Sequence, residues 1–334
     1  MARRAACWGQ LVVEIVWFKR DLRVVDHAPL AAAAGKGPVL CLFVHEDEVI
    51  GADDFSARHL HFLNECLHEL QAAIRELGGR LLLRRGEMTE VLSALKREIG
   101  PFRLWSHEET GNGVTYARDL RVADWCVGHG VEWVEIPQHG VVRRLKTRDG
   151  WSRSWQRRMD EPVVAAPEAI RAVVEPDSLG LLGPVEFGLS EMETKGRQRG
   201  GRRLGLQLLD TFFSERGVDY TRAMSSPVTA FDACSRISPH LTWGSVSVRE
   251  AYQAGLARRE ELNVMKAEGI AFDPRWRSAL KSFLGRLRWH CHFMQKFEDE
   301  PDIEFWNMSR MYDGMREHEW DDGKYLSLIH ISEP

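Results

Sequence analysis

The sequence predicts an α/β fold with a doubly wound parallel sheet, followed through a long connection by an all-helical domain. Three observations predict this architecture. In the first part of the chain, apolar runs of strand length alternate with helical patterns, which is typical of a parallel sheet with helices on both faces. From Leu204 onward only helical patterns occur. With 334 residues, the chain is long enough for two domains.

The expected strands are short apolar runs. The first, 12–18 (VVEIVWF), is rich in β-branched residues, as buried parallel strands are. Further strands are expected at 39–44, 80–83, 102–106 and 131–136. Helices, with apolar residues at helical spacing, are expected between them at 55–77, 88–99 and 115–128. Periodicity alone fits any nucleotide-binding α/β domain equally well.

The segment 138–203 has no regular pattern. Its first part is basic and contains Trp151 and Trp155, and several prolines follow. We expect an interdomain connection there and not a packed layer. The chain therefore divides into an α/β domain at 1–137, this connection at 138–203, a helical domain at 204–325 and a tail at 326–334.

Within the helical domain, three helices are expected. Ser247 and Glu250 have the spacing of a capping box, which predicts a helix start at that point. An apolar face over 206–213 predicts a helix before it, and the pattern of 282–297 predicts one after it.

Composition limits the classes of function. The net charge of −4 argues against an overall basic nucleic-acid binder but leaves room for a local basic groove. The six cysteines form no CxxC pair, which favours reduced thiols over a disulfide framework or a metal site. No apolar run has the length of a membrane span. Glu14 interrupts the apolar start, so we interpret 1–10 as a loose leader and expect a cytoplasmic protein. We also expect a monomer.

A phosphate site is predicted around 234–244 (CSRISPHLTWG). Ser238 followed by Pro239 is typical of an N-cap residue and the first position of a helix. Free N–H groups and the positive end of the helix dipole suit a pyrophosphate there. Ser235 adds a hydroxyl donor and Arg236 a permanent positive charge. A helix cap without a ligand is the simpler alternative.

The segments 16–23 (VWFKRDLR), 234–249 and 283–293 (FLGRLRWHCHF) together resemble the DNA photolyase/cryptochrome family. The segment 16–23 (VWFKRDLR), continuing to Asp26 and His27, resembles the opening motif of the family. Its charges have an expected structural role, with Asp21 paired to Arg20 or Arg23. The segment 234–249 resembles the one that holds the phosphates of the flavin dinucleotide. The segment 283–293 (FLGRLRWHCHF) resembles the helix that lines the flavin and lesion pocket.

The resemblance implies FAD as cofactor and damaged DNA, carrying a pyrimidine dimer, as partner. The implied FAD contacts are Tyr220, Cys234, Ser235, Arg236 and Ser238. Cys234 stands where the family has threonine, so one hydroxyl donor is lost. The implied DNA contacts are Arg286, Trp289 and His290. Arg286 replaces a glutamate of the family and His290 an arginine, and a core tryptophan flanked by surface residues is the alternative interpretation.

The activity that the resemblance implies is light-driven repair of pyrimidine dimers by electron transfer from reduced FAD, a carbon–carbon lyase reaction. A cryptochrome with the same fold and FAD but without repair is the alternative, and a plain nucleotide-binding protein is the rival from another class. An antenna chromophore can bind in the α/β domain of the family. Glu108, Glu109 and Asn112 follow the fourth expected strand, at the usual ligand edge of such a sheet.

The end of the sequence departs from the family. The segment 320–324 (WDDGK) resembles a step that precedes most of the flavin-ring pocket in the family, but LSLIHISEP follows here. We interpret 326–334 as a non-native tail and expect a truncated helical domain that is inactive by itself. For this reason no catalytic residue is assigned.

Overall fold

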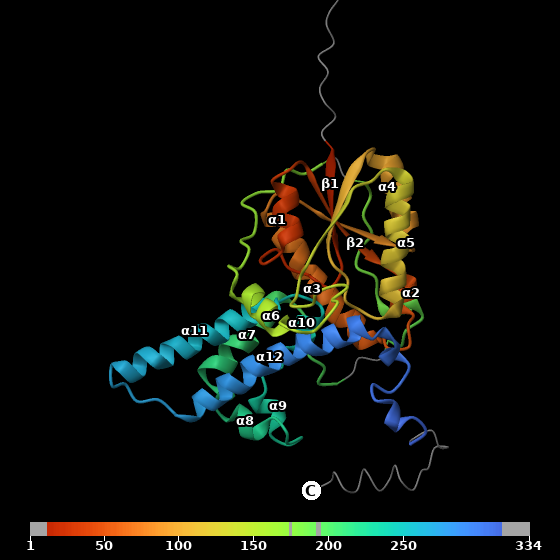
Figure 1. Ribbon diagram of the computed structural model, residues 1–334. Helices are drawn as coiled ribbons and strands as arrows, with labels where there is room; N and C mark the ends of the chain where they lie inside the picture. Colours follow the sequence, from red (N-terminus) through yellow and green to blue (C-terminus); the bar gives the residue numbers. More distant parts are fainter. Residues whose placement is uncertain (1–11, 174–175, 192–194, 316–334) are drawn as a thin grey trace, which may run out of the picture.

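A five-stranded parallel sheet forms the upper part of the molecule in Figure 1, a computed structural model that describes residues 12–173, 176–191 and 195–315. The strands lie in the order β3-β2-β1-β4-β5, which is that of a doubly wound sheet. Their bounds are β1 Val13–Phe18, β2 Val39–His45, β3 Leu81–Arg85, β4 Phe102–His107 and β5 Trp133–Ile136. Each strand predicted from the sequence is present, within two residues of its expected limits.

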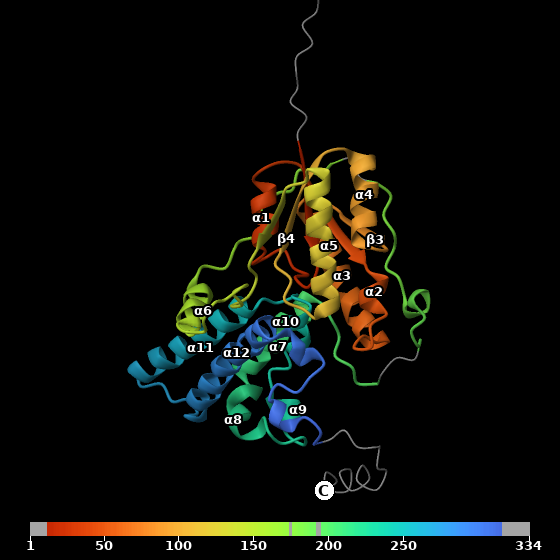
Figure 2. The ribbon, with the colours of Figure 1, turned by 45° about the vertical axis from the view of Figure 1, so that its right-hand side comes forward.

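Helices cover both faces of this sheet (Figures 1 and 2). On one face, α1 (Ala28–Ala34) and α3 (Ala57–Glu76) pack against side chains such as Val16 and Phe43. On the other, α4 (Met88–Ile99) and α5 (Gly113–His129) pack against the alternate residues, such as Ile15 and Leu42. A short helix, α2 (Asp47–Ile50), follows β2. The α/β prediction is therefore confirmed.

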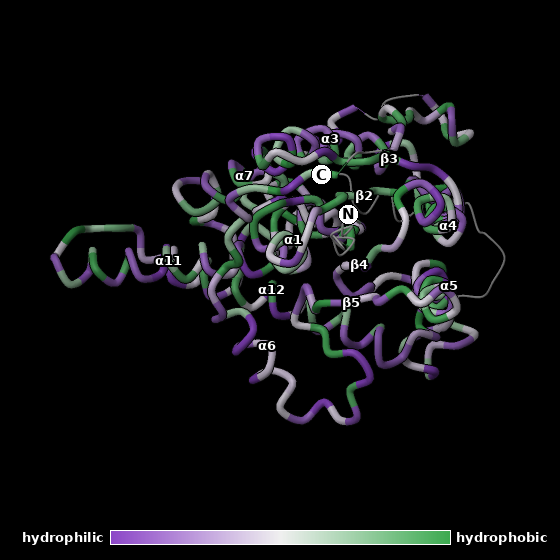
Figure 3. Tube along the Cα trace, turned by 90° about the horizontal axis from the view of Figure 1, so that it is seen from above, coloured by the Kyte–Doolittle hydropathy of each residue, from purple (hydrophilic) through white to green (hydrophobic). Residues whose placement is uncertain are grey.

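The lower part of the molecule is helical. The two long helices α11 (Val248–Ala267) and α12 (Arg275–Asp299) contact each other, and Figure 3 shows α11 extending beyond the rest of the molecule. Buried aromatic residues such as Phe212, Phe213 and Phe283 form its core. The other helices are α7 (Arg202–Ser214), α8 (Tyr220–Ala223), α9 (Ala230–Ala233) and α10 (Ser238–Thr242). Single turns of 3-10 helix occur at Pro184–Phe187, Arg216–Asp219, Pro301–Glu304 and Arg310–Tyr312. None of the described helices is long and apolar enough to cross a membrane.

The segment expected to be an unpacked connection contains a packed helix, α6 (Trp151–Asp160). Trp151, Trp155 and Met159 recur every four residues, so they share one face and are buried in the helical core. Arg153 and Arg157 lie on the exposed side. The basic residues concealed the apolar spacing in the sequence.

Two helix starts test the capping predictions. The capping box of α11 is confirmed, since Glu250 N donates to Ser247 Oγ at 3.0 Å and Ser247 N donates to Glu250 Oε2 at 2.9 Å. The expected N-cap role of Ser238 is wrong. Ile237 occupies that position, Ser238 is already helical, and its side chain makes no capping bond.

The turn between β1 and α1 joins the sheet to the helices. The carboxylate of Asp26 accepts hydrogen bonds from Ser247 Oγ at 2.6 Å and from Arg249 Nη1 at 2.7 Å. Arg23 donates to the carbonyl oxygen of Gly244 at 2.8 Å, and Leu22 N donates to that of Trp243 at 3.1 Å. Residues more than 200 positions apart in the chain thus form one buried polar joint.

The substitution Asp26→Asn should destabilise the fold by about 2 kcal/mol at neutral pH, because the buried guanidinium of Arg249 then keeps only the exposed carboxylate of Glu161 as a counter-charge. Burial alone would raise the pKa of Asp26, but the bond from Ser247 and the charges of Arg23 and Arg249 outweigh it, and the pKa is lowered. The stabilisation is therefore complete above the usual carboxyl pKa of about 3.9 and is lost as the pH falls below it.

Urea unfolding of the wild type, Asp26→Asn and Asp124→Asn at several pH values checks this prediction. Asp124 is exposed and its side chain makes no hydrogen bond or ion pair with the described residues, so it serves as the control. Equal stability of the wild type and Asp26→Asn at pH 7 would contradict the prediction, and so would a deficit that does not shrink in acid.

Candidate functional site

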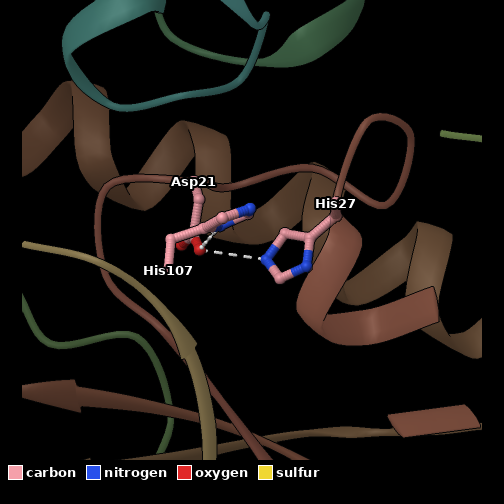
Figure 4. Close-up of side chains that lie close together, drawn as sticks. All are labelled: Asp21, His27 and His107. Carbon is pink, nitrogen blue, oxygen red and sulfur yellow. Dashed lines mark hydrogen bonds and ion pairs between the residues drawn. The ribbon is translucent and has the colours of Figure 1, made fainter. Parts of the chain in front are cut away.

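A buried carboxylate between two histidines lies directly behind the ligand edge of the sheet. Figure 4 shows that the imidazoles of His27 and His107 both point at Asp21. His107 Nδ1 lies 2.6 Å and His27 Nε2 3.0 Å from Asp21 Oδ2, and Lys19 N donates to Oδ1 at 2.7 Å. The expected partners of Asp21, Arg20 and Arg23, are thus replaced by histidines as its closest contacts.

The distances around Asp21 fit hydrogen bonds and not a shared metal ion. The three donor atoms lie within 4.8 Å of one another. Two ligand atoms at about 2.0–2.2 Å from one tetrahedral zinc ion, however, lie more than 3 Å from each other. His107 Nδ1 and Asp21 Oδ2 are only 2.6 Å apart, so they cannot both bind such an ion. Because His27 Nδ1 accepts the N–H of Leu30, a neutral His27 carries its proton on Nε2, toward Asp21.

The protonation states agree with this network. Burial lowers the pKa of His107 to about 3, so its ring is neutral at pH 7. Burial alone would raise the pKa of Asp21, but the two histidines outweigh it and hold the pKa well below its usual value. The cluster therefore fixes the end of β1 against the end of β4.

A cavity of about 300 Å³ lies between this edge of the sheet and the helices. Glu108, Glu109 and Asn112 line it, as the sequence predicted for the ligand edge. Glu109 accepts from Arg118 at 2.8 Å, and Asn112 caps α5 by accepting from Thr115 N. Burial raises the pKa of Glu108. Of the three, Glu108 is therefore the most available to a ligand.

Two polar groups in the cavity lack a partner within the part of the chain that the structure describes. His139 is buried, its Nδ1 has no hydrogen-bond partner, and burial holds its pKa well below the usual value. Arg20 lines the cavity and forms no ion pair. Unpaired polar groups in a cavity of this size are what a polar ligand would contact.

The five predicted flavin contacts form a second region, on the helical side. Arg216 holds the backbone of the segment by donating to the carbonyl oxygens of Cys234 and Ser235. Arg236 has a φ of 58°, in the left-handed region, and its guanidinium lies 3.7 Å from the centre of the Phe231 ring. Such backbone strain in a residue other than glycine is frequent at functional sites.

This region is electropositive. Burial and the nearby charge of Arg236 lower the pKa of Arg216. Among the described residues Arg236 forms no ion pair, and the hydroxyls of Ser235 and Ser238 make no hydrogen bond. Burial raises the pKa of Tyr220, and Cys234 and Arg286 are close enough for their charges to affect this pKa. The predicted residues therefore do come together, with Arg286 beside them. Sequence reasoning missed Arg216, which no motif marked.

An open pocket of about 510 Å³ adjoins this region on α12. Arg286 and Trp289 line it together with Lys281, and Trp289 is 59% exposed. The structure separates His290 from these two, because His290 lines the interdomain cavity, where its ring centre is 6.3 Å from that of His139. Adjacent helical residues point about 100° apart, so positions 289 and 290 cannot serve one surface equally.

Comparisons with known proteins agree with this geometry. The profile of the DNA photolyase family matches residues 14–161. The chain is 27% identical to the deoxyribodipyrimidine photo-lyase of Halobacterium salinarum over 85% of its own length and 61% of the relative. It is 27% identical to the deoxyribodipyrimidine photo-lyase of Streptomyces griseus, over 93% of this chain and 67% of that relative. It is 26% identical to cryptochrome-2 of Arabidopsis thaliana, over 72% of this chain and 42% of that relative.

Solved structures share the fold. A class III photolyase from Agrobacterium tumefaciens superposes with a TM-score of 0.76 at 20% identity, over 97% of this chain and 66% of that one. An archaeal photolyase from Sulfolobus tokodaii, solved with two FAD molecules, superposes with a TM-score of 0.70 at 21% identity, over 95% of this chain and 66% of that one. The chain thus spans about two thirds of the length of these proteins. The family match over residues 14–161, together with this similarity, supports the assignment of the chain to the DNA photolyase/cryptochrome family.

Proposed function

We propose that the protein repairs pyrimidine dimers in DNA by light-driven electron transfer from FAD, as a deoxyribodipyrimidine photo-lyase. One observation carries the proposal: an electropositive segment suited to phosphates lies beside an open pocket with an exposed tryptophan and two cations. A cofactor and a nucleic acid could therefore bind next to each other. The relatives named as photo-lyases support this activity. We further propose that it acts as a cytoplasmic monomer.

The residues present fit the phosphates of FAD. Arg236 supplies a charge with no competing carboxylate among its described contacts, and Ser235 and Ser238 supply free hydroxyls. Tyr220 closes one side as a buried aromatic wall, whereas the thiol of Cys234 is a weak donor. When bound, reduced FAD supplies the light-excited electron that splits the dimer, and the protein positions it and excludes water.

The DNA surface would consist of Lys281, Arg286 and Trp289. A dimer must leave the duplex to approach a buried cofactor, and damaged bases flip at lower cost. The exposed ring of Trp289 offers a stacking face for such a base. Lys281 and Arg286 would bind the adjacent phosphates. His290 has no place on this surface because it lines the interdomain cavity.

We place an antenna chromophore in the interdomain cavity. Its volume of about 300 Å³ is at the lower end of the usual range for ligand pockets. Arg20 would meet an anionic group, and Glu108 and His139 would meet polar atoms of a ring system. The identity of the chromophore stays open.

A cryptochrome function without repair is the second candidate. Arg286 lines the pocket where the resemblance implies a glutamate that contacts the lesion, so one repair contact differs. The similarity to cryptochrome-2 of Arabidopsis thaliana favours this alternative as well.

A repair assay distinguishes these functions. The protein is expressed from the complete open reading frame that contains this chain, because the relatives are longer. It is then incubated with a dimer-bearing oligonucleotide in blue light and in darkness. Repair in light alone is expected. Bound flavin without repair would indicate a cryptochrome, and absence of a flavin spectrum would contradict both candidates.

The substitution Arg236→Ala should weaken FAD binding by about tenfold to a hundredfold, because a hydrogen bond to a charged group contributes about 1.5–3 kcal/mol. Titration followed by flavin fluorescence measures this change. Arg259→Ala, on the exposed side of α11, is the matched control and should bind as the wild type does. Unchanged affinity of Arg236→Ala would refute the phosphate assignment.

The substitutions Lys281→Ala and Arg286→Ala should each weaken DNA binding and reduce its dependence on salt. Each lost phosphate contact lowers the slope of log K against log salt by about 0.7–0.9. Fluorescence anisotropy with a labelled oligonucleotide at several salt concentrations gives these slopes. Lys266→Ala, at the far end of α11, should leave the slope unchanged. Identical slopes for all four proteins would count against this surface.

A further inference from the structure

The short helix α10 rests directly on the turn after β1. Gly244 follows α10 with a φ of 64°, a conformation that glycine adopts without strain. A Cβ atom at this position would lie 2.2 Å from the carbonyl oxygen of Arg20 and 2.5 Å from Asp21 Cα. The backbone of the helical part therefore touches the backbone of the opening motif, and only glycine permits this contact.

Arg23 fixes this contact with a buried guanidinium. Its side chain donates to the carbonyl oxygens of Gly244 and of Asp26, each at 2.8 Å. The residue is 1% exposed, and burial lowers its pKa. Burying an arginine side chain costs free energy. That Arg23 is nevertheless buried between the carbonyl groups of Gly244 and Asp26 indicates that the relative position of these two groups is important. Leu22 N adds a third bond, to Trp243 O.

The other end of α10 carries the phosphate segment. Ser238 is the first residue of the helix, and Ser235 and Arg236 lie just before it, separated from it by Ile237. A helix of this length spans about 7.5 Å, so a displacement at Gly244 is transmitted to Ser238. Arg216 and Gln198 hold the segment itself through the carbonyl oxygens of Ser235 and Arg236. The segment is thus held at its start by Arg216 and beyond its end by Arg23.

We propose that Arg23 is a positioning residue for the flavin phosphates, acting through Gly244 and α10. It touches no phosphate itself. It sets the distance of Ser235, Arg236 and Ser238 from the turn after β1 and so presents them to the ligand together. The opening motif of the α/β domain thereby contributes to the affinity of a cofactor held by the helical part. This inference rests on the proposed binding of FAD.

Titrations of FAD and ADP with the continuous reading frame that contains this chain test the inference, and ADP isolates the phosphate contribution. Arg23→Met should weaken the binding of both ligands by about tenfold or more, in the range that loss of a charged hydrogen bond produces. Arg23→Lys keeps the charge and one donor, so it should recover part of the affinity. Gly244→Ala should weaken binding as well, because its Cβ displaces α10.

Leu92→Ala is the matched control. Leu92 is fully buried on the opposite face of the sheet, among α4 residues, so its truncation lowers stability without touching α10. All titrations are made at a temperature at which near-ultraviolet circular dichroism shows each variant to be folded. Leu92→Ala should bind both ligands like the wild type, which a general effect of lost stability would not produce.

The outcomes distinguish a failure of the positioning role of Arg23 from a failure of the proposed function. If the wild type binds FAD and Arg23→Lys and Gly244→Ala bind it equally well, the positioning role is wrong and the proposed function stands. These two variants decide the question even if Arg23→Met does not fold. If Leu92→Ala loses as much affinity as the Arg23 variants, the effect is one of stability and the inference fails. If the wild type binds neither FAD nor ADP, the proposed function fails, and the inference with it.

Discussion

The buried joint in the turn after β1 is the interaction on which the rest of the structure depends. Asp26 meets Arg249 and Ser247, while Arg23 meets the backbone of Gly244. In the interior, an unpaired carboxylate or guanidinium is far more costly than a paired one. Separating the helices from the sheet would therefore leave these charges without their partners, so the helices keep one fixed position relative to the sheet.

This arrangement creates both candidate ligand regions. It sets the carboxyl ends of β1, β4 and β5 opposite α10 and α12, and the interdomain cavity lies between them. It also fixes α10, whose far end carries the phosphate segment. One short helix thus borders the cavity through Leu241 and Thr242 and adjoins the proposed flavin site through Ser238. The position of a single turn governs the geometry of two regions.

The sequence was most informative where one physical signal dominates. Buried parallel strands are nearly continuous apolar runs, so all five were predicted, and the capping box of Ser247 and Glu250 was read correctly. Signals that overlap misled the interpretation. In α6, basic residues masked the regular spacing of Trp151, Trp155 and Met159. The helix α10 begins at Ser238 itself, one residue earlier than an N-cap role of Ser238 would require. The exact first residue of a helix is the feature that sequence patterns define least well.

Long-range partners were beyond the reach of sequence patterns. Asp21 was assigned to neighbouring arginines, yet it contacts His107, which lies 86 positions away. The resemblance implied DNA contacts for both Trp289 and His290, but these two side chains line different cavities. Arg216, which holds the phosphate segment, belongs to no recognisable motif. Tertiary packing decides such contacts, and local spacing does not encode it.

Native-state hydrogen exchange tests most directly whether the turn after β1 joins sheet and helices into one cooperative unit. If it does, the amide protons of β1 and of the buried face of α11 open with the same free energy and respond equally to denaturant, since neither part unfolds alone. If the α11 amides exchange through a separate opening of lower free energy, with a smaller denaturant dependence than β1, the two parts are independent and the joint does not govern the structure.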